Sequence, residues 1–124
     1  MQAYKVEKKE LISKHDAIRY QLLTELVFLR KESLIKSDMD ILILLSMWGP
    51  IELSTFCNEA AKVMYEITKM EEFSVKAQNI RNRVSKLQKR GLVTKIEKKI
   101  QIDPSIKVVT KGNILIDYNF LAKE

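Results

Sequence analysis

The spacing of apolar residues predicts a chain that begins with a long amphipathic helix. From about Lys8 to Arg30 apolar positions recur at intervals of three, four or seven residues. The stripe consists of Leu11, Ile18, Leu22, Leu26 and Leu29, widened by Ile12, Leu23 and Val27. We interpret this helix either as packed on its own domain or as an arm for dimerisation or docking, since the stripe is wider than a small domain needs.

Two further helices are predicted in the middle of the chain. Ser37 and Asp40 resemble a capping pair that opens a helix from Asp38 to Trp48. This helix is apolar nearly all round, so it is predicted to be the buried centre. Its apolar residues are Ile41, Leu42, Ile43, Leu44, Leu45 and Met47. After Gly49-Pro50, a third helix is predicted over residues 51–69. Its predicted inner face consists of Leu53, Phe56, Ala60, Val63, Met64 and Ile67.

A fourth helix is predicted from Val75 to Lys89, with Ser74 as its cap and residues 70–73 as a connecting turn. Glycine at position 91 suits the left-handed residue that commonly ends a helix. At 100° per residue, Ala77, Ile80, Val84 and Leu87 gather on one side, and amide, hydroxyl and basic side chains gather on the other. The helix is therefore predicted to bury one side and expose a polar, basic one.

The pattern becomes extended after this helix. Residues 92–96 and 100–102 are predicted as two strands joined by residues 97–99, and Pro104 is expected to end the ladder. A last extended run is predicted over residues 113–120, after a turn at Lys111-Gly112. The expected fold class is therefore mainly α with a small β wing (α+β). Residues 1–36 are expected to form a helical arm and residues 37–124 a domain with an extended tail.

The positive charge of the chain is concentrated in one segment. The net charge is +6, and residues 74–96 hold seven of the 22 cations and none of the 16 acids. The remaining 15 cations are balanced by those 16 acids. A surplus clustered in this way favours contact with a polyanion over a role in solubility alone. We also considered a merely solvated basic face, and a face that meets an acidic protein.

The stretch from Ser74 to Lys95 resembles the recognition helix and first wing strand of winged helix-turn-helix proteins of the MarR and PadR families. The match is closest over Leu87-Gln-Lys-Arg-Gly-Leu-Val93. The resemblance spans about residues 37–101, with a specific part of some 20 residues. It implies recognition-helix roles for Gln78, Asn79, Asn82, Arg83, Ser85 and Lys86, and backbone contacts for Lys95, Lys98 and Lys99. Lys76, Lys89 and Arg90 complete the predicted DNA-binding residues.

The sequence departs from those families in two places. The predicted third helix is longer than their scaffold helix, and residues 103–124 are extended where a regulator has a dimerisation helix. The segments around Trp48-Gly-Pro and Gly112-Asn-Ile-Leu are also similar to small winged-helix proteins of tailed phages. Two functions follow as expectations. The first is a DNA-binding transcriptional regulator that dimerises through the arm. The second is a structural or adaptor component of a large assembly, such as the head–tail connector region of a phage virion.

Candidates for catalysis are few, and we expect the protein not to be an enzyme. His15 is expected to be a surface or partly buried imidazole, and Cys57 a small core residue. One His and one Cys are too few for an ordinary zinc site, and Gly49, Gly91 and Gly112 are isolated, so no metal or cofactor is expected. Expected partners are duplex DNA and further protein subunits, through the first helix and the tail, and no membrane. The expected location is the cytoplasm or the inside of a phage particle.

Overall fold

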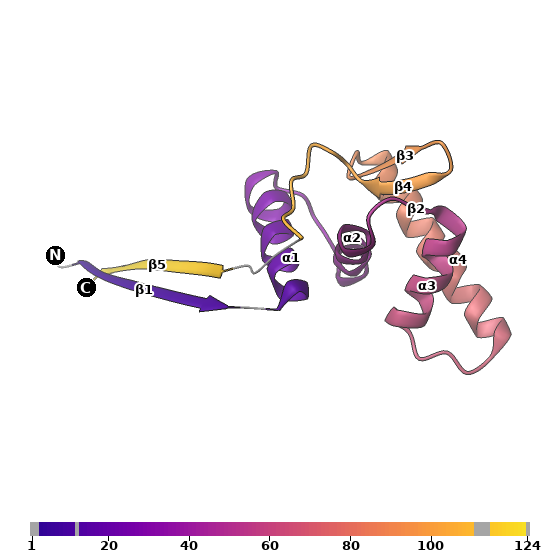
Figure 1. The fold of residues 1–124 in the computed structure, drawn as a ribbon, viewed down its shortest axis with the longest axis horizontal. Coiled ribbons are helices and arrows are strands. Elements are labelled where there is room, and N and C mark those ends of the chain that lie inside the picture. The colour runs from indigo at the N-terminus through magenta and orange to yellow at the C-terminus, as the bar shows by residue number, and fades with distance from the viewer. Residues whose placement is uncertain (1–2, 12, 111–114, 124) are drawn as a thin grey trace.

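The protein is mainly helical, with one small antiparallel sheet and one separate two-stranded ribbon (Figure 1). This computed structural model describes residues 3–11, 13–110 and 115–123, with side chains over residues 13–110. The helices are α1 (Lys14–Leu22), the π-helix η1 (Leu23–Leu29), α2 (Lys36–Trp48), α3 (Leu53–Met64) and α4 (Met70–Lys89). The strands are β1 (Ala3–Leu11), β2 (Ile51–Glu52), β3 (Val93–Ile96), β4 (Lys99–Ile102) and β5 (Leu115–Lys123).

Helix α2 lies at the centre of the core, as its apolar sequence predicts. Every residue from Ile41 to Leu45 is buried, and only Met47 of the apolar set is exposed. The predicted capping pair is wrong, because the carboxylate that caps the helix belongs to Asp38. Its Oδ2 accepts a hydrogen bond from the backbone N–H of Ile35 at 3.3 Å. At the other end Gly49, with φ of +70°, turns the chain out of the helix.

The first predicted helix is correct from residue 14 onward and wrong before it. Residues 8–11 belong to β1, and Ser13 caps α1 by accepting a hydrogen bond from the N–H of Asp16. Ile18, Leu22 and Leu26 are fully buried in the core that α2 forms, whereas Leu29 is 67% exposed. This part of the stripe is therefore packed on the chain's own domain, and its use for dimerisation or docking stays a prediction.

Strands β1 and β5 pair antiparallel over nine positions, from Ala3 opposite Lys123 to Leu11 opposite Leu115. They form a ribbon that projects from the helical body, with the start of β1 and the end of β5 at its far tip (Figure 1). The extended run predicted near the end of the chain is thus confirmed from residue 115 onward. The predicted turn at Lys111-Gly112 lies outside the described residues, as do residues 113 and 114.

Helix α3 is shorter than the sequence pattern predicts. Residues 51–52 form β2, the helix ends at Met64, and Tyr65 is extended with φ of −127°. Within α3 Phe56 and Ala60 are buried as predicted, but Val63 is 63% exposed. Trp48 packs edge-on against Phe56, with ring centroids 5.6 Å apart. Helix α3 thus has 12 residues, where the pattern predicted a helix over residues 51–69.

Helix α4 begins five residues earlier than predicted, at Met70, so Ser74 lies inside the helix and does not cap it. Its end is as predicted. Gly91 has φ of +78°, and its N–H bonds the carbonyl of Gln88 while the N–H of Leu92 bonds the carbonyl of Leu87. This pair of reversed hydrogen bonds is the Schellman arrangement, which needs a left-handed residue that glycine adopts without strain.

The three-stranded sheet has the order β2-β4-β3, all antiparallel. Strands β3 and β4 form the predicted hairpin, and β4 ends at Ile102, before Pro104. Its central strand contributes Ile100 to the core, where it is fully buried. The sheet caps the top of α2 and α4 and leaves the hairpin tip free (Figure 1).

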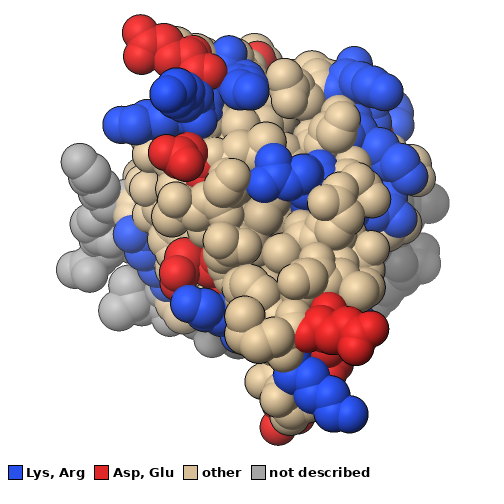
Figure 2. All heavy atoms as spheres, turned by 90° about the vertical axis from the view of Figure 1, so that its right-hand side faces the viewer, with Lys and Arg blue, Asp and Glu red and all other residues tan. Residues whose placement is uncertain are grey.

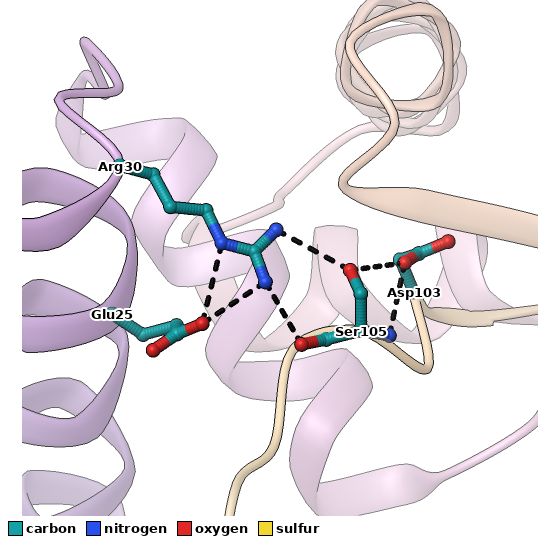
Figure 3. A network of polar contacts seen from close by, with 4 residues as sticks. All are labelled: Glu25, Arg30, Asp103 and Ser105. Carbon is teal, nitrogen blue, oxygen red and sulfur yellow. Dashed lines mark hydrogen bonds and ion pairs between the residues drawn. The ribbon is translucent and has the colours of Figure 1, made fainter.

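The chain after β4 is held against the end of η1 by polar contacts (Figure 3). Arg30 bonds Glu25 at 3.0 Å and the carbonyl oxygen of Ser105 at 2.8 Å. Asp103 accepts hydrogen bonds from the hydroxyls of Ser105 and Thr94, and these bonds lower the pKa of its carboxyl. Further on, the carboxamide of Gln21 bonds both the N–H and the C=O of Val109. This segment leads the chain back past α1 towards β5.

Candidate nucleic-acid interface

Helix α4 separates its side chains as its sequence predicts. Ile80, Val84 and Leu87 are buried and Ala77 is half-buried, while the opposite side faces solvent. We name this solvent side the outer face; it consists of Gln78, Asn79, Asn82, Ser85, Lys86 and Lys89, all of which are exposed. The outer face contains no acid, and it offers two ammonium groups, three carboxamides and a hydroxyl. Such groups suit phosphates and base edges.

Two residues of the outer face are already ordered by each other. The side-chain N–H of Gln78 donates to Oδ1 of Asn82 at 3.0 Å, one helical turn away. This bond does not use the carbonyl oxygen of Gln78 or the amide group of Asn82, so the pair keeps one acceptor and one donor for a ligand. Adenine presents a complementary donor and acceptor in the major groove.

Three predicted contact residues lie on the flank of α4, which we define as Lys76, Arg83 and Arg90. Each already has a partner within the protein. Lys76 Nζ lies 4.6 Å from the ring centroid of Tyr65, and Arg83 lies 3.8 Å from Asp38. Arg90 bonds Glu32 at 2.6 Å and the carbonyl oxygen of Ser33 at 2.8 Å. The flank residues are therefore used, at least in part, to hold α4 to its neighbours.

Asp38 is the acid that two of the flank residues, Arg83 and Arg90, approach. It is 3% exposed and accepts from Ile35, and both Arg83 and Arg90 lie within 4 Å of its carboxylate. A buried carboxylate is strongly destabilising unless it is paired and hydrogen-bonded. Asp38 therefore requires these cations, and no local pattern indicates the pairing, because Asp38 precedes Arg83 by 45 residues.

The β3–β4 hairpin supplies a second basic surface. Lys95, Lys98 and Lys99 are exposed, and so is the apolar side chain of Ile96 at 54%. Ile96 pairs with Lys99, so the loop has only two residues, Glu97 and Lys98. Glu97 adopts φ of +57°, which lets the tight turn close. All three predicted wing lysines thus lie together on one exposed hairpin.

One part of the side of the molecule that α3 and α4 form carries cations without acids. Figure 2 shows Lys and Arg gathered along the upper right of this view without an acid among them. Elsewhere in the view, at the left and at the bottom, Lys and Arg are interspersed with Asp and Glu. Helix α4 itself contributes acids only in its first turn, at Glu71 and Glu72, which precede the segment that the sequence marks as acid-free. The early start of α4 thus adds an acidic end to an otherwise basic helix.

Sequence reasoning missed a hollow beside the outer face. It has a volume of about 340 Å³ and is bordered by Asn79, Asn82, Arg83 and Lys86 of α4. Ser37 of α2 and Tyr65, just after α3, border its other side. These two residues come from distant parts of the chain, so no local pattern could have connected them with α4. Four of the predicted DNA contacts therefore border one concave site.

The residues considered for catalysis are placed as expected. Cys57 is buried, and burial raises the pKa of its thiol. His15 is exposed on α1, 3.9 Å from Asp16. Over the part of the chain that the structure describes, no three His, Cys, Asp or Glu side chains come together as a metal site would require. Within the same residues no helix is long and apolar enough to cross a membrane.

Comparison of the chain with protein-family models, with curated protein sequences and with solved structures finds no match to any of the three.

Proposed function

We propose that this chain is a winged-helix protein that binds duplex DNA as a transcriptional regulator and has no enzymatic activity. The order of elements from α2 to β4 supports the proposal. It runs helix, short strand, helix, helix and hairpin, and the short strand β2 joins the hairpin at the edge of β4. A winged helix has this order, with its recognition helix where α4 lies and its wing where the β3–β4 hairpin lies.

The observation that carries the proposal is the exposure of the outer face beside the hairpin lysines. Basic residues in a helix often serve only to solvate it, and they are then interspersed with acids. Here Lys86, Lys89 and the three hairpin lysines are exposed, and the segment from Ser74 to Ile96 contains no acid. A recognition helix needs such a surface, because phosphates attract cations and repel carboxylates.

The geometry divides the proposed contacts into two roles. Gln78 and Asn82, ordered by their mutual hydrogen bond, would read a base edge in the major groove, with adenine as the matching base. Lys86, Lys89, Lys95, Lys98 and Lys99 would neutralise phosphates. The flank residues Lys76 and Arg90 take no direct part in this revised interface, because Tyr65, Glu32 and Ser33 already engage them.

Fluorescence anisotropy of a labelled duplex, titrated with the protein across a range of salt concentrations, tests the proposal. Each neutralised phosphate adds about −0.9 to the slope of log K against log salt. Five lysines therefore predict a slope of about −4 to −5. Lys62→Ala removes an exposed cation of α3 that lies outside the proposed interface, and this control should leave the slope unchanged. Absent binding, or binding that ignores salt, would overturn the proposal.

The β1–β5 ribbon favours a second candidate, an adaptor or structural component of a larger assembly such as a phage virion. A two-stranded ribbon is marginally stable alone in water, and this one projects away from the body (Figure 1). Tyr20, Phe28 and Leu29 are also exposed on α1 and η1. Light scattering of the full chain discriminates the two candidates: a ring or larger closed oligomer supports the adaptor, and a monomer or dimer supports the regulator.

A further inference from the structure

The hollow beside the outer face is lined mainly by polar and basic groups. These are the hydroxyl groups of Ser37 and Tyr65, and the amide and basic groups of α4. Ile41 and Ile80 lie behind them and are fully buried, so the accessible apolar surface comes from Met64, half-buried at the end of α3, and from the ring of Tyr65. Among the residues that the structure describes, no acid lines the hollow. A ligand that fits this lining must present a group that accepts several hydrogen bonds.

The electrostatics of the rim specify the charge of that group. Lys86 is exposed, and among the described residues the structure gives it no acidic partner. Arg83 lies 3.8 Å from Asp38, a distance that leaves most of its five N–H donors unused. Asn79 and Asn82 add neutral donors. Cations and amides that converge on one concave site bind carboxylates and phosphates through short, charge-assisted hydrogen bonds.

We propose that this hollow is a binding site for a small organic anion that has one phosphate or carboxylate group. The volume of about 340 Å³ falls within the range of small-molecule sites. Lys86 and Arg83 hold the anionic group at the rim, and the organic body lies against Met64 and Tyr65, which are half-buried. The site belongs to the folded body of the protein and needs no second subunit.

Occupancy of this site regulates the DNA interface, an extension that rests on the proposed function. Asn79, Asn82, Arg83 and Lys86 line the hollow, and all four belong to the predicted DNA contacts. An anion bound there places negative charge against the phosphates of an approaching duplex and occupies Lys86. Because the two ligands require the same groups, each lowers the affinity for the other. The small anion thus releases the protein from DNA.

Amide chemical shifts of the ¹⁵N-labelled full chain test the site without DNA. Phenyl phosphate and benzoate are the probes, and benzyl alcohol, which has the same apolar body and no charge, is the control. Saturable shifts are expected at Ser37, Tyr65, Asn79 and Asn82 with both anions and not with the alcohol. Inorganic phosphate, which lacks the apolar body, should bind more weakly than phenyl phosphate. Absence of saturable shifts with both anions overturns the site.

A matched pair of variants separates the anion site from the DNA interface. Lys86→Ala and Lys89→Ala remove the same charge from the same exposed side of α4, but only Lys86 lines the hollow. Lys86→Ala should weaken phenyl phosphate binding about tenfold, the effect of losing one charge-assisted hydrogen bond, and Lys89→Ala should leave it unchanged. Equal losses in both variants would overturn the site. Asn82→Ala replaces Lys86→Ala if that variant fails to fold.

A competition experiment tests the regulation separately. Phenyl phosphate is expected to release a labelled duplex from the protein at concentrations that saturate the amide shifts, and benzyl alcohol is not. Duplex that stays bound at saturating probe overturns the regulation. If the protein shows the amide shifts with phenyl phosphate but binds no duplex, the anion site is supported. The same result overturns both the proposed function and its regulation.

Discussion

Lys86 of α4 and Arg90, the residue directly after this helix, carry the same charge, yet their surroundings differ. Arg90 reaches back to Glu32, Ser33 and Asp38, whereas Lys86 points to solvent at the rim of the hollow. The difference follows from their positions along the chain, because Arg90 is the residue that ends α4 and lies beside the segment before α2. We therefore expect a cation to contact DNA only where it has no partner within the protein.

Lys86→Ala should weaken DNA binding without loss of stability. The side chain is exposed, and such surface substitutions usually change the free energy of unfolding by less than about 0.5 kcal/mol. Loss of one phosphate contact should reduce the slope of log K against log salt by about 0.9. Anisotropy titrations measure the slope, and thermal unfolding measures the stability. An unchanged slope in a folded variant would remove Lys86 from the interface.

Asp103 gives a prediction for pH. Hydrogen bonds from Ser105 and then Thr94 lower the pKa of its carboxyl below the ordinary value of 3.8, so the charged form favours the folded state. The stabilisation is therefore present above that ordinary value and is lost as the pH falls through the lowered pKa. Asp103→Asn should lower Tm at neutral pH, and its difference from the parent should shrink at low pH.

Thermal unfolding of the parent protein and of Asp103→Asn, between neutral pH and about pH 3, measures the difference in Tm between them. Glu66→Gln is the control, because Glu66 is exposed and this substitution also removes one carboxylate. A difference between parent and Asp103→Asn that stays constant with pH would mean that the carboxylate does not stabilise this corner through its charge.

Elements whose boundaries are encoded locally could be predicted from the sequence. The buried side of α4 follows from the three- and four-residue spacing of Ile80, Val84 and Leu87, and its end follows from Gly91. The spacing of apolar residues and the local turn signals also predicted α2 and the hairpin. The exposed basic residues of α4 were identifiable for the same reason, because the buried side of a helix determines the opposite one.

Elements defined by distant partners could not be predicted. Strand β1 contains charged residues in succession, and its strand character comes from β5, more than 100 residues later. The end of α3 at Met64 was missed because Ile67 continues the helical spacing and no glycine or proline interrupts it. The pairing of Asp38 with Arg83 and Arg90, and the hollow beside it, depend on how α2 packs against α4.

Arg90→Ala should destabilise the fold and leave the salt slope of DNA binding unchanged. The variant leaves Glu32 without its cation and leaves Asp38, which is 3% exposed, with Arg83 alone. A loss of about 1–3 kcal/mol in the free energy of unfolding is expected, because a buried charge loses part of its compensation. Urea denaturation measures the loss. A variant of parental stability with a reduced salt slope would place Arg90 in the interface.

At the scale of the whole molecule, the possible interaction surfaces lie at opposite ends. The outer face and the hairpin lie on the side of α4, and the β1–β5 ribbon projects from the other end beyond α1 (Figure 1). The buried residues of α1 tie the two ends together through a core shared with α2. A DNA-bound protein of this shape would direct its ribbon away from the duplex, towards any protein partner.

A map of amide chemical shifts in the ¹⁵N-labelled full chain during titration with a duplex shows directly where DNA binds. Binding through the outer face and the hairpin predicts shifts along α4 from Gln78 to Lys89 and along the hairpin from Val93 to Ile102, with α1 and the ribbon unaffected. Shifts confined to α1, η1 or the ribbon, or no shifts at a salt concentration that favours binding, would contradict it.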